Sequence, residues 1–225
     1  MTAIPLLPVE SEAQGTRTFR HILSVIARDP LSLASTIIIL VFLLVAIIGP
    51  LIAPYPDQGA GVTNVSNKMM PPSADTLMGT DRLGRDMFSR VIMGARLAAG
   101  VPLGIVFLAI LIGAPLGAIA GYKGGWVDEA IMRITDLFLA FPPLLLAMAI
   151  TAALGRGIQN ATIALVVSWW PWYARLVRGV TISLRERYFV EAAQAVGVRD
   201  SVIILSHILP NTISPILVQA TVDLG

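Results

Sequence analysis

The residues that could do chemistry in this 225-residue chain are few and widely spaced. His21 and His207 are its two histidines, and it has no cysteine, so the ligand clusters of a zinc site are missing. Ser206 precedes His207, but adjacent helical residues do not face each other, and no orienting acid is at hand. The sequence therefore indicates a non-catalytic protein with no metal site and no cofactor.

Phosphate chemistry is excluded in a similar way. The lysines are Lys68 and Lys123, and neither ends the Gly-x-x-x-x-Gly-Lys-Ser/Thr loop whose amides cradle nucleotide phosphates. Basic residues form no run and do not alternate with aromatic ones, so the pattern does not suggest nucleic acid. An ATP-driven role would therefore need separate ATPase subunits.

The elements that must position any functional residue are apolar. Hydrophobic residues make up 56% of the chain and charged residues 13%, whereas soluble domains carry about a quarter charged residues. The charges gather in clusters, separated by five uncharged segments that approach the roughly 20 residues a membrane helix needs. Helices satisfy their own backbone hydrogen bonds in lipid, so the sequence predicts an all-α bundle of about five spans. These are residues 31–53, 97–121, 137–154, 158–174 and 201 to the end.

The first apolar segment starts too late and runs too long for a cleaved signal peptide, so it is predicted to be a retained anchor. Lys and Arg are distributed in a way that leans toward a cytoplasmic N-terminus, with the loop 54–96 outside. In that loop Asp81 is a candidate N-cap of an amphipathic surface helix leading into the second span. Its apolar face would carry Leu83, Met87, Val91 and Ala95.

The second span carries glycines at helical spacing. Gly113, Gly117 and Gly121 form two consecutive Gly-x-x-x-Gly repeats, which let helix backbones approach closely in lipid. Packing within the chain and contact with a second membrane subunit both fit this pattern.

The longest polar insert after residue 96 begins at Arg175, between two apolar spans. Residues 183–196 favour helix, and Arg187 and Glu191 stand one turn apart within it, where they could pair. Gly197 is placed to end this helix in a left-handed conformation. The insert therefore predicts a short helix followed by a sharp turn.

A second helix should come after that turn and re-enter the membrane. Asp200 is a plausible N-cap for it, with the helix covering residues 201–209. Pro210 and Pro215 should interrupt or bend the chain beyond this helix, because proline cannot donate a backbone hydrogen bond.

These residues resemble a known family. Glu191-Ala192-Ala193, then Gly197, then Ile208-Leu209-Pro210 are similar to the EAA loop of ABC-importer permeases. The flanking sequences 187–197 and 207–211 resemble the dipeptide/oligopeptide/nickel branch, and specifically its C-type permease subunit. Residues 77–86 with Gly94-Ala95-Arg96 are similar to the extracytoplasmic segment of that branch, and residues 136–142 to its third span. The resemblance covers most of the chain from about residue 20.

The resemblance implies a cytoplasmic tail at 1–30 and, at 31–225, a transmembrane domain of the type I ABC-importer permease kind. It implies that residues 175–207 form a cytoplasmic coupling loop that docks on an ATPase. The coupling residues would be Arg187, Glu191, Ala192, Ala193, Gly197, Leu209 and Pro210. An ordinary loop helix with a solvated Glu191 is the alternative interpretation. Candidate contacts for an extracytoplasmic protein are Asp81, Arg82, Arg85 and Asp86.

The implied protein is a multi-pass permease subunit in the bacterial inner membrane, part of an ATP-driven importer of peptides or related small solutes. The implied partners are a second, distinct permease in a heterodimer, two cytoplasmic ATPase subunits, an extracytoplasmic solute-binding protein and membrane lipid. Such permeases continue for about two further membrane passages after the EAA loop, so the resemblance implies a C-terminally truncated chain. A stand-alone secondary transporter or channel is the alternative; it would rely on intramembrane charges or inverted repeats.

Overall fold

The first apolar segment forms the first described helix of the computed structural model, which describes residues 28–224. α2 (Pro30–Ile52) begins after Asp29, whose carboxylate accepts hydrogen bonds from the Ser32 amide (3.0 Å) and hydroxyl (2.5 Å). Most of its side chains are exposed and apolar, which suits a lipid environment. The predicted tail lies, up to residue 27, outside the described residues.

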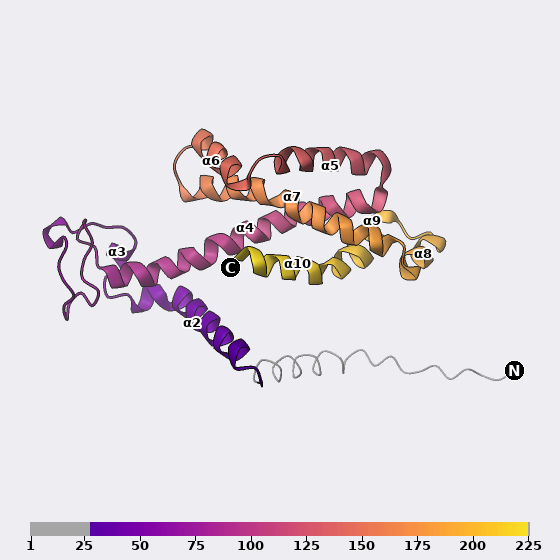
Figure 1. Cartoon of the computed structure of the whole chain (residues 1–225). Coiled ribbons are helices and arrows are strands. Elements are labelled where there is room, and N and C mark those ends of the chain that lie inside the picture. Colours follow the sequence, from indigo (N-terminus) through magenta and orange to yellow (C-terminus); the bar gives the residue numbers. More distant parts are fainter. Residues whose placement is uncertain (1–27, 225) are drawn as a thin grey trace. The chain divides into compact units, whose positions relative to one another are not determined.

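The chain divides into two compact units, with the boundary between Ala99 and Gly100. The first contains α2, a long loop with α3 (Pro56–Gly59) and η1 (Val65–Asn67), and the start of α4 (Met87–Lys123). The second contains the rest of α4 followed by α5 (Gly125–Leu139), α6 (Pro143–Leu154), α7 (Ile158–Arg185), α8 (Tyr188–Ala195), α9 (Asp200–Ile203), the π-helical turn η2 (Ile204–Ile208) and α10 (Leu209–Leu224) (Figure 1). Residues 28–224 contain no β-strand, so the predicted all-α fold is confirmed.

Within residues 28–224, three helical segments are long and apolar enough to cross a bilayer: Pro30–Ile52, Met87–Lys123 and Asp200–Leu224. A further crossing is available if α5 and α6 are taken as one span bent by 84°. α7 contains the predicted span 158–174 but continues to Arg185, so its apolar and arginine-bearing halves share one helix about 42 Å long. The arrangement is compatible with about five spans.

The predicted span at 137–154 is wrong as one continuous helix. α5 ends at Leu139 and α6 begins at Pro143, with the 84° bend between them. Pro142 and Pro143 lack the amide hydrogens that would continue the α5 ladder, whereas proline suits the first position of a new helix. The proline pair therefore divides an apolar run that hydropathy alone would make a single rod.

The predicted helix leading into the second span does form, but its cap and start are wrong. Residues 81–86 lie outside it, with a turn at 82–83, and α4 begins at Met87 and runs without a break to Lys123. Asp86 takes the capping role, because its Oδ2 accepts a hydrogen bond from the Ser89 amide at 2.7 Å. The Asp81 carboxylate instead accepts from the amides of Leu83 (2.8 Å) and Arg85 (2.9 Å), which closes a turn.

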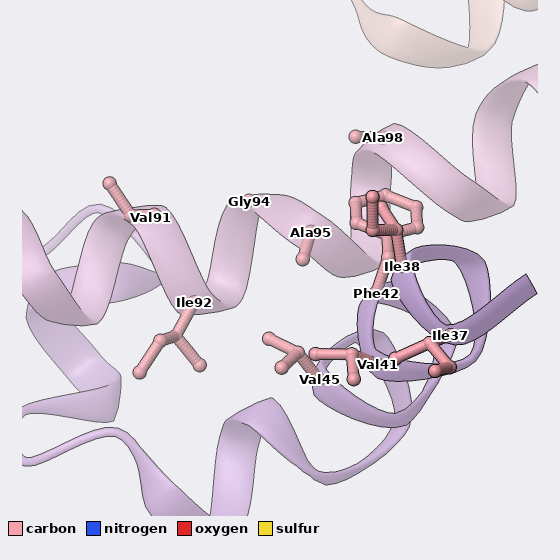
Figure 2. A pocket seen from close by; sticks show the side chains of 10 residues that line it. All are labelled: Ile37, Ile38, Val41, Phe42, Val45, Val91, Ile92, Gly94, Ala95 and Ala98. Carbon is pink, nitrogen blue, oxygen red and sulfur yellow. The ribbon is translucent and has the colours of Figure 1, made fainter. Parts of the chain in front are cut away.

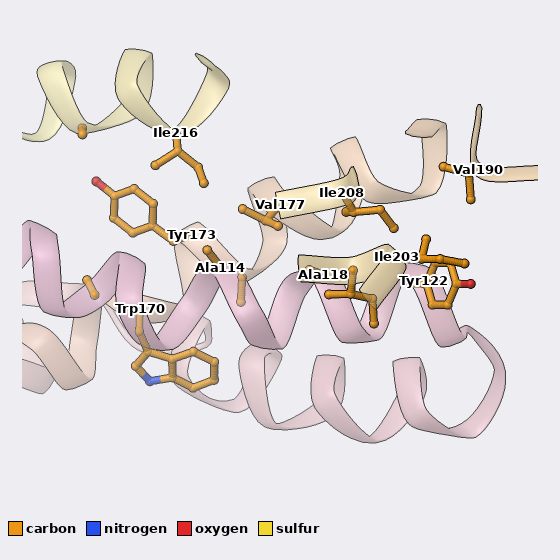
Figure 3. Packing of buried hydrophobic residues seen from close by; sticks show 14 of the residues in the cluster. Ala114, Ala118, Tyr122, Trp170, Tyr173, Val177, Val190, Ile203, Ile208 and Ile216 are labelled. Carbon is orange, nitrogen blue, oxygen red and sulfur yellow. The ribbon is translucent and has the colours of Figure 1, made fainter. Parts of the chain in front are cut away.

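The core of the second unit forms where α4 and α7 touch. A methyl group at Gly113, Gly117 or Gly121 would overlap α7, and the backbone oxygens it would meet belong to Trp170, Ala174 and Arg178. The glycine row therefore serves packing within the chain, one of the two predicted possibilities. Figure 3 shows the buried side chains that gather around this contact, drawn from α4, α7, α8, α9, η2 and α10.

Candidate functional site

The polar insert after α7 folds into two short helices joined by a glycine turn. α7 ends at Arg185 and α8 begins at Tyr188, so the predicted single helix over 183–196 is wrong. Arg187 is the N-cap of α8, with extended backbone (φ −90°, ψ 142°), and among the described residues no ion pair joins it to Glu191. The break frees α8 to take its own direction, and the predicted Arg187–Glu191 pair does not form.

Gly197 ends α8 as predicted. Its φ is +79°, a backbone conformation that residues other than glycine rarely adopt. The Gly197 amide donates to the Gln194 carbonyl (2.9 Å), and the Val198 amide donates to the Ala193 carbonyl (3.0 Å). This pair of bonds is a Schellman motif, which satisfies the last carbonyls of α8 and reverses the chain tightly.

The two faces of α8 differ. Val190 and Ala193 are buried in the core cluster, so the small size of Ala193 serves internal packing rather than contact with a partner. Glu191 and Ala192 are exposed, and so are the remaining residues of α8, which are Tyr188 (90% exposed), Phe189, Gln194 and Ala195. α8 therefore presents an outward surface of aromatic, aliphatic and carboxylate groups on a firmly anchored helix.

The helix after the turn re-enters the apolar region without stopping. Asp200 is its first residue rather than its N-cap, and its carboxylate bonds to the end of α4. The Leu209 amide donates to the Ile204 carbonyl, five residues back, which makes a wider, π-helical turn. This turn directly precedes Pro210, which has no amide hydrogen to donate. Leu209 packs on the core and Pro210 is exposed in α10, so both lie in the re-entering helix and not in the glycine turn.

Sequence reasoning missed a polar cluster at the base of the loop, here called the Tyr122 junction and made of Tyr122, Lys123, Arg185, Gln194 and Asp200. Gln194 Nε2 donates to the Tyr122 hydroxyl (3.0 Å), which donates to Asp200 Oδ1 (3.1 Å). Lys123 Nζ lies 2.6 Å from Asp200 Oδ2, and an Arg185 nitrogen donates to the Tyr122 carbonyl (3.2 Å). These partners are up to 78 residues apart, so no local spacing could have revealed them.

Two ion pairs tie α5 to the arginine-bearing half of α7. Arg178 donates two hydrogen bonds to the Asp128 carboxylate, at 2.5 and 2.6 Å, and Arg175 pairs with Asp136. The fork of two parallel bonds holds the Arg178 pair in one geometry. α7 is thereby anchored next to the loop by charge as well as by the glycine contact.

Three of the four candidate contact residues in the outer loop, Asp81, Arg85 and Asp86, bond within the loop and the start of α4. Asp81 pairs with Arg85 (2.8 Å) and Arg90 (2.7 Å). Burial raises the pKa of Asp81, but hydrogen bonds from Arg85 and Leu83 and the Arg85 charge outweigh it and lower the pKa to about 2. Asp86 is buried at the start of α4, whereas Arg82 is exposed.

The first unit also contains an open groove of about 630 Å³ between α2 and the start of α4 (Figure 2). Its lining is aliphatic and aromatic, from Ile37, Ile38, Val41, Phe42, Val45, Val91, Ile92, Gly94, Ala95 and Ala98. No lining side chain carries a hydrogen-bonding group, so the groove can offer only apolar contact. Among the described residues no His, Asp and Glu side chains gather to hold a metal ion.

Two family models match the chain. Residues 113–225 match the binding-protein-dependent transport system inner membrane component, and residues 18–72 match the N-terminal transmembrane domain of oligopeptide transport permease C. The first model covers the whole of the loop described above, including α8, Gly197 and the re-entering helix.

Individual relatives agree with the family models. The dipeptide transport system permease protein DppC of Alkalihalophilus pseudofirmus is 44% identical over 97% of this chain and 71% of its own length. The probable D,D-dipeptide transport system permease protein DdpC of Escherichia coli K12 is 39% identical, over 88% of this chain and 65% of its own length. The glutathione transport system permease protein GsiD of Escherichia coli O157:H7 is 41% identical, with the same coverage. This chain thus spans about two thirds of the length of such relatives, and it belongs to the family of binding-protein-dependent transport system inner membrane components.

Proposed function

We propose that the chain is a permease subunit of an ATP-driven importer of peptides or related small solutes, and that α8 and its glycine turn form the coupling loop. The observation that carries this proposal is the anchored α8 helix with an outward surface around Glu191. A helix that is fixed to the core on one face and exposed on the other can transmit a push from a partner to the spans behind it.

The physical requirement for such coupling is a rigid connection. Val190 and Ala193 seat α8 in the core cluster, and the Schellman motif fixes the turn after it. ATP binding must favour one membrane conformation through contacts that differ between the two states. The exposed Glu191 carboxylate and the neighbouring Tyr188 ring would supply the contact with the ATPase.

The solute class is proposed from the relatives. Their names specify dipeptides, D,D-dipeptides and glutathione, all of which contain amide bonds between small amino-acid units. The partners proposed are a second permease, two ATPase subunits, an extracytoplasmic solute-binding protein and surrounding lipid. With α8 facing the ATPase, the N-terminus is cytoplasmic and the loop 54–86 is outside, where the exposed Arg82 is a contact for the binding protein.

The test is assembly of the full-length permease with its partners in proteoliposomes. The ATPase should co-purify with the native permease, and Glu191→Arg should abolish both its retention and solute uptake, because the new charge would oppose the docking contact. Glu129→Arg is a matched control, since Glu129 is exposed on α5 and, within residues 28–224, pairs only with Arg133 of its own helix (2.6 Å).

Three outcomes separate the alternatives. Loss of ATPase retention with Glu191→Arg but not with Glu129→Arg supports the coupling role. Retention and uptake that survive Glu191→Arg refute docking through this carboxylate. Uptake that continues without any ATPase present would favour a stand-alone secondary transporter.

A further inference from the structure

We propose that the Tyr122 hydroxyl is a positioning group that transmits movement of the α8 helix to the membrane helix α4. The inference rests on the proposed coupling function of α8 and adds the residue through which the movement would pass. Tyr122 itself touches neither solute nor nucleotide in this scheme; it acts by holding Gln194 and Asp200.

Four elements meet at this one residue. Tyr122 lies in the last turn of α4, Gln194 in the last turn of α8, and Asp200 is the first residue of α9. The hydroxyl accepts from Gln194 at 3.0 Å and donates to Asp200 at 3.1 Å, so one oxygen is bonded to both sides of the glycine turn. Arg185, the last residue of α7, donates to the Tyr122 carbonyl at 3.2 Å. A change in the direction of α8 would therefore act on the end of α4 through this hydroxyl.

The ring and the hydroxyl of Tyr122 have different tasks. Tyr122 is buried, 6% exposed, and belongs to the cluster that also contains Ile203; Figure 3 labels both among its buried side chains. The ring thus anchors the end of α4 by packing. Loss of the hydroxyl should leave no buried group unpaired, because its two partners, Gln194 and Asp200, are exposed and could bond to water in its absence.

This separation of tasks makes the hydroxyl dispensable for the fold and specific to positioning. Hydrogen bonds need near-linear geometry at about 2.7 to 3.2 Å, so these two bonds specify the angle of α8 and α9 against α4. Water in their place would satisfy the same groups without specifying any angle. The Lys123–Asp200 pair adds a second attachment at the same end of α4; it is about half exposed, and exposed ion pairs contribute little.

The experiment uses the full-length permease assembled with the second permease, the ATPase subunits and the solute-binding protein in nanodiscs. ATPase retention, basal ATP hydrolysis and hydrolysis stimulated by the binding protein with the probe dipeptide alanyl-alanine are measured for Tyr122→Phe. We expect retention and basal hydrolysis to be unchanged and the stimulation ratio to fall roughly fivefold, the change that a hydrogen bond of ordinary net strength makes in an equilibrium.

Gln194→Leu removes the same hydrogen bond from the other side and decides the question if Tyr122→Phe does not assemble. Combined with Tyr122→Phe it should cause no further loss, because Tyr122→Phe has already removed the bond to Gln194. Tyr55→Phe is the control, since the Tyr55 hydroxyl has no hydrogen-bond partner among residues 28–224; it should keep the native ratio. A native stimulation ratio in Tyr122→Phe overturns this inference and leaves the proposed function standing. If Tyr122→Phe does not assemble, a native stimulation ratio in Gln194→Leu has the same meaning. A native complex that neither retains the ATPase nor shows stimulation overturns the proposed function and this inference together.

Discussion

Replacing Gly197 with alanine separates the backbone requirement of the turn from every other effect. Gly197 has φ +79°, where a Cβ costs about 1–2 kcal/mol. No atom lies within 4 Å of the position that this Cβ would take, so steric overlap adds nothing to the cost. Since about 1.4 kcal/mol is a factor of ten, the equilibrium for opening the turn should rise roughly fivefold to thirtyfold.

Hydrogen exchange of single amides reports this opening directly. The Gly197 and Val198 amides are protected by their bonds to Gln194 and Ala193, so in the alanine variant the Val198 amide should exchange faster by the same factor. If the turn also positions α8 for docking, ATPase retention should weaken in parallel.

Two further variants make the reasoning refutable. Gly197→Asn should exchange more slowly than the alanine variant, because asparagine tolerates the left-handed conformation better. Gly179→Ala, inside α7 and also in open space, should be neutral or stabilising by up to about 1 kcal/mol. Equal exchange in the glycine and alanine proteins, or faster exchange with asparagine than with alanine, would show that the left-handed turn is not what holds α8.

Two other predictions concern the membrane contact and the outer loop. Gly117→Val should destabilise the chain in detergent by about 1–3 kcal/mol or more, because the side chain would overlap the Ala174 backbone, whereas Gly104→Val has open space and should keep the native melting temperature; equal melting temperatures would contradict the helix contact. Asp81 has a pKa of about 2, below its usual 3.8, so its stabilisation of the outer loop is complete above about pH 4 and is lost as the pH falls toward 2. The rate of pepsin cleavage within residues 62–86, corrected for the enzyme's own pH dependence, should therefore rise in the native chain as the pH falls from about 4 to about 2. Asp81→Asn should not show this rise. A native loop equally resistant at about pH 4 and about pH 2 would refute the stabilising role of the Asp81 carboxylate.

Local features of the loop could be predicted because they depend on neighbours in the chain. Gly197 comes after a helix-favouring run, and the Schellman turn it forms needs only the preceding turn of α8. The break at Arg187 could not be predicted because most residues of 183–196 favour helix, including Arg185, Glu186 and Arg187 at the break itself.

The polar contacts of the site could not be predicted from spacing. Asp200 has the type and position of an N-cap, yet its carboxylate finds Tyr122 and Lys123, which are distant in sequence and carry stronger donors. Asp86 rather than Asp81 caps α4 for a related reason, since Arg85 and Arg90 hold the Asp81 carboxylate in the loop. Several acidic residues stood at suitable positions, and tertiary partners decided among them.

The sequence alone determined that this chain is an all-α membrane protein with a glycine-ended helix between two apolar spans, because lipid burial and left-handed turns depend on residue type within one short segment. The tertiary structure decided which face of α8 is free. Ala193 lies inward and Glu191 outward because Val190 and Ala193 belong to the buried cluster that α4, α7 and α9 also form. It also brought Tyr122 to Gln194 across 72 residues of chain, a juxtaposition that depends on how long helices pack and not on any local preference.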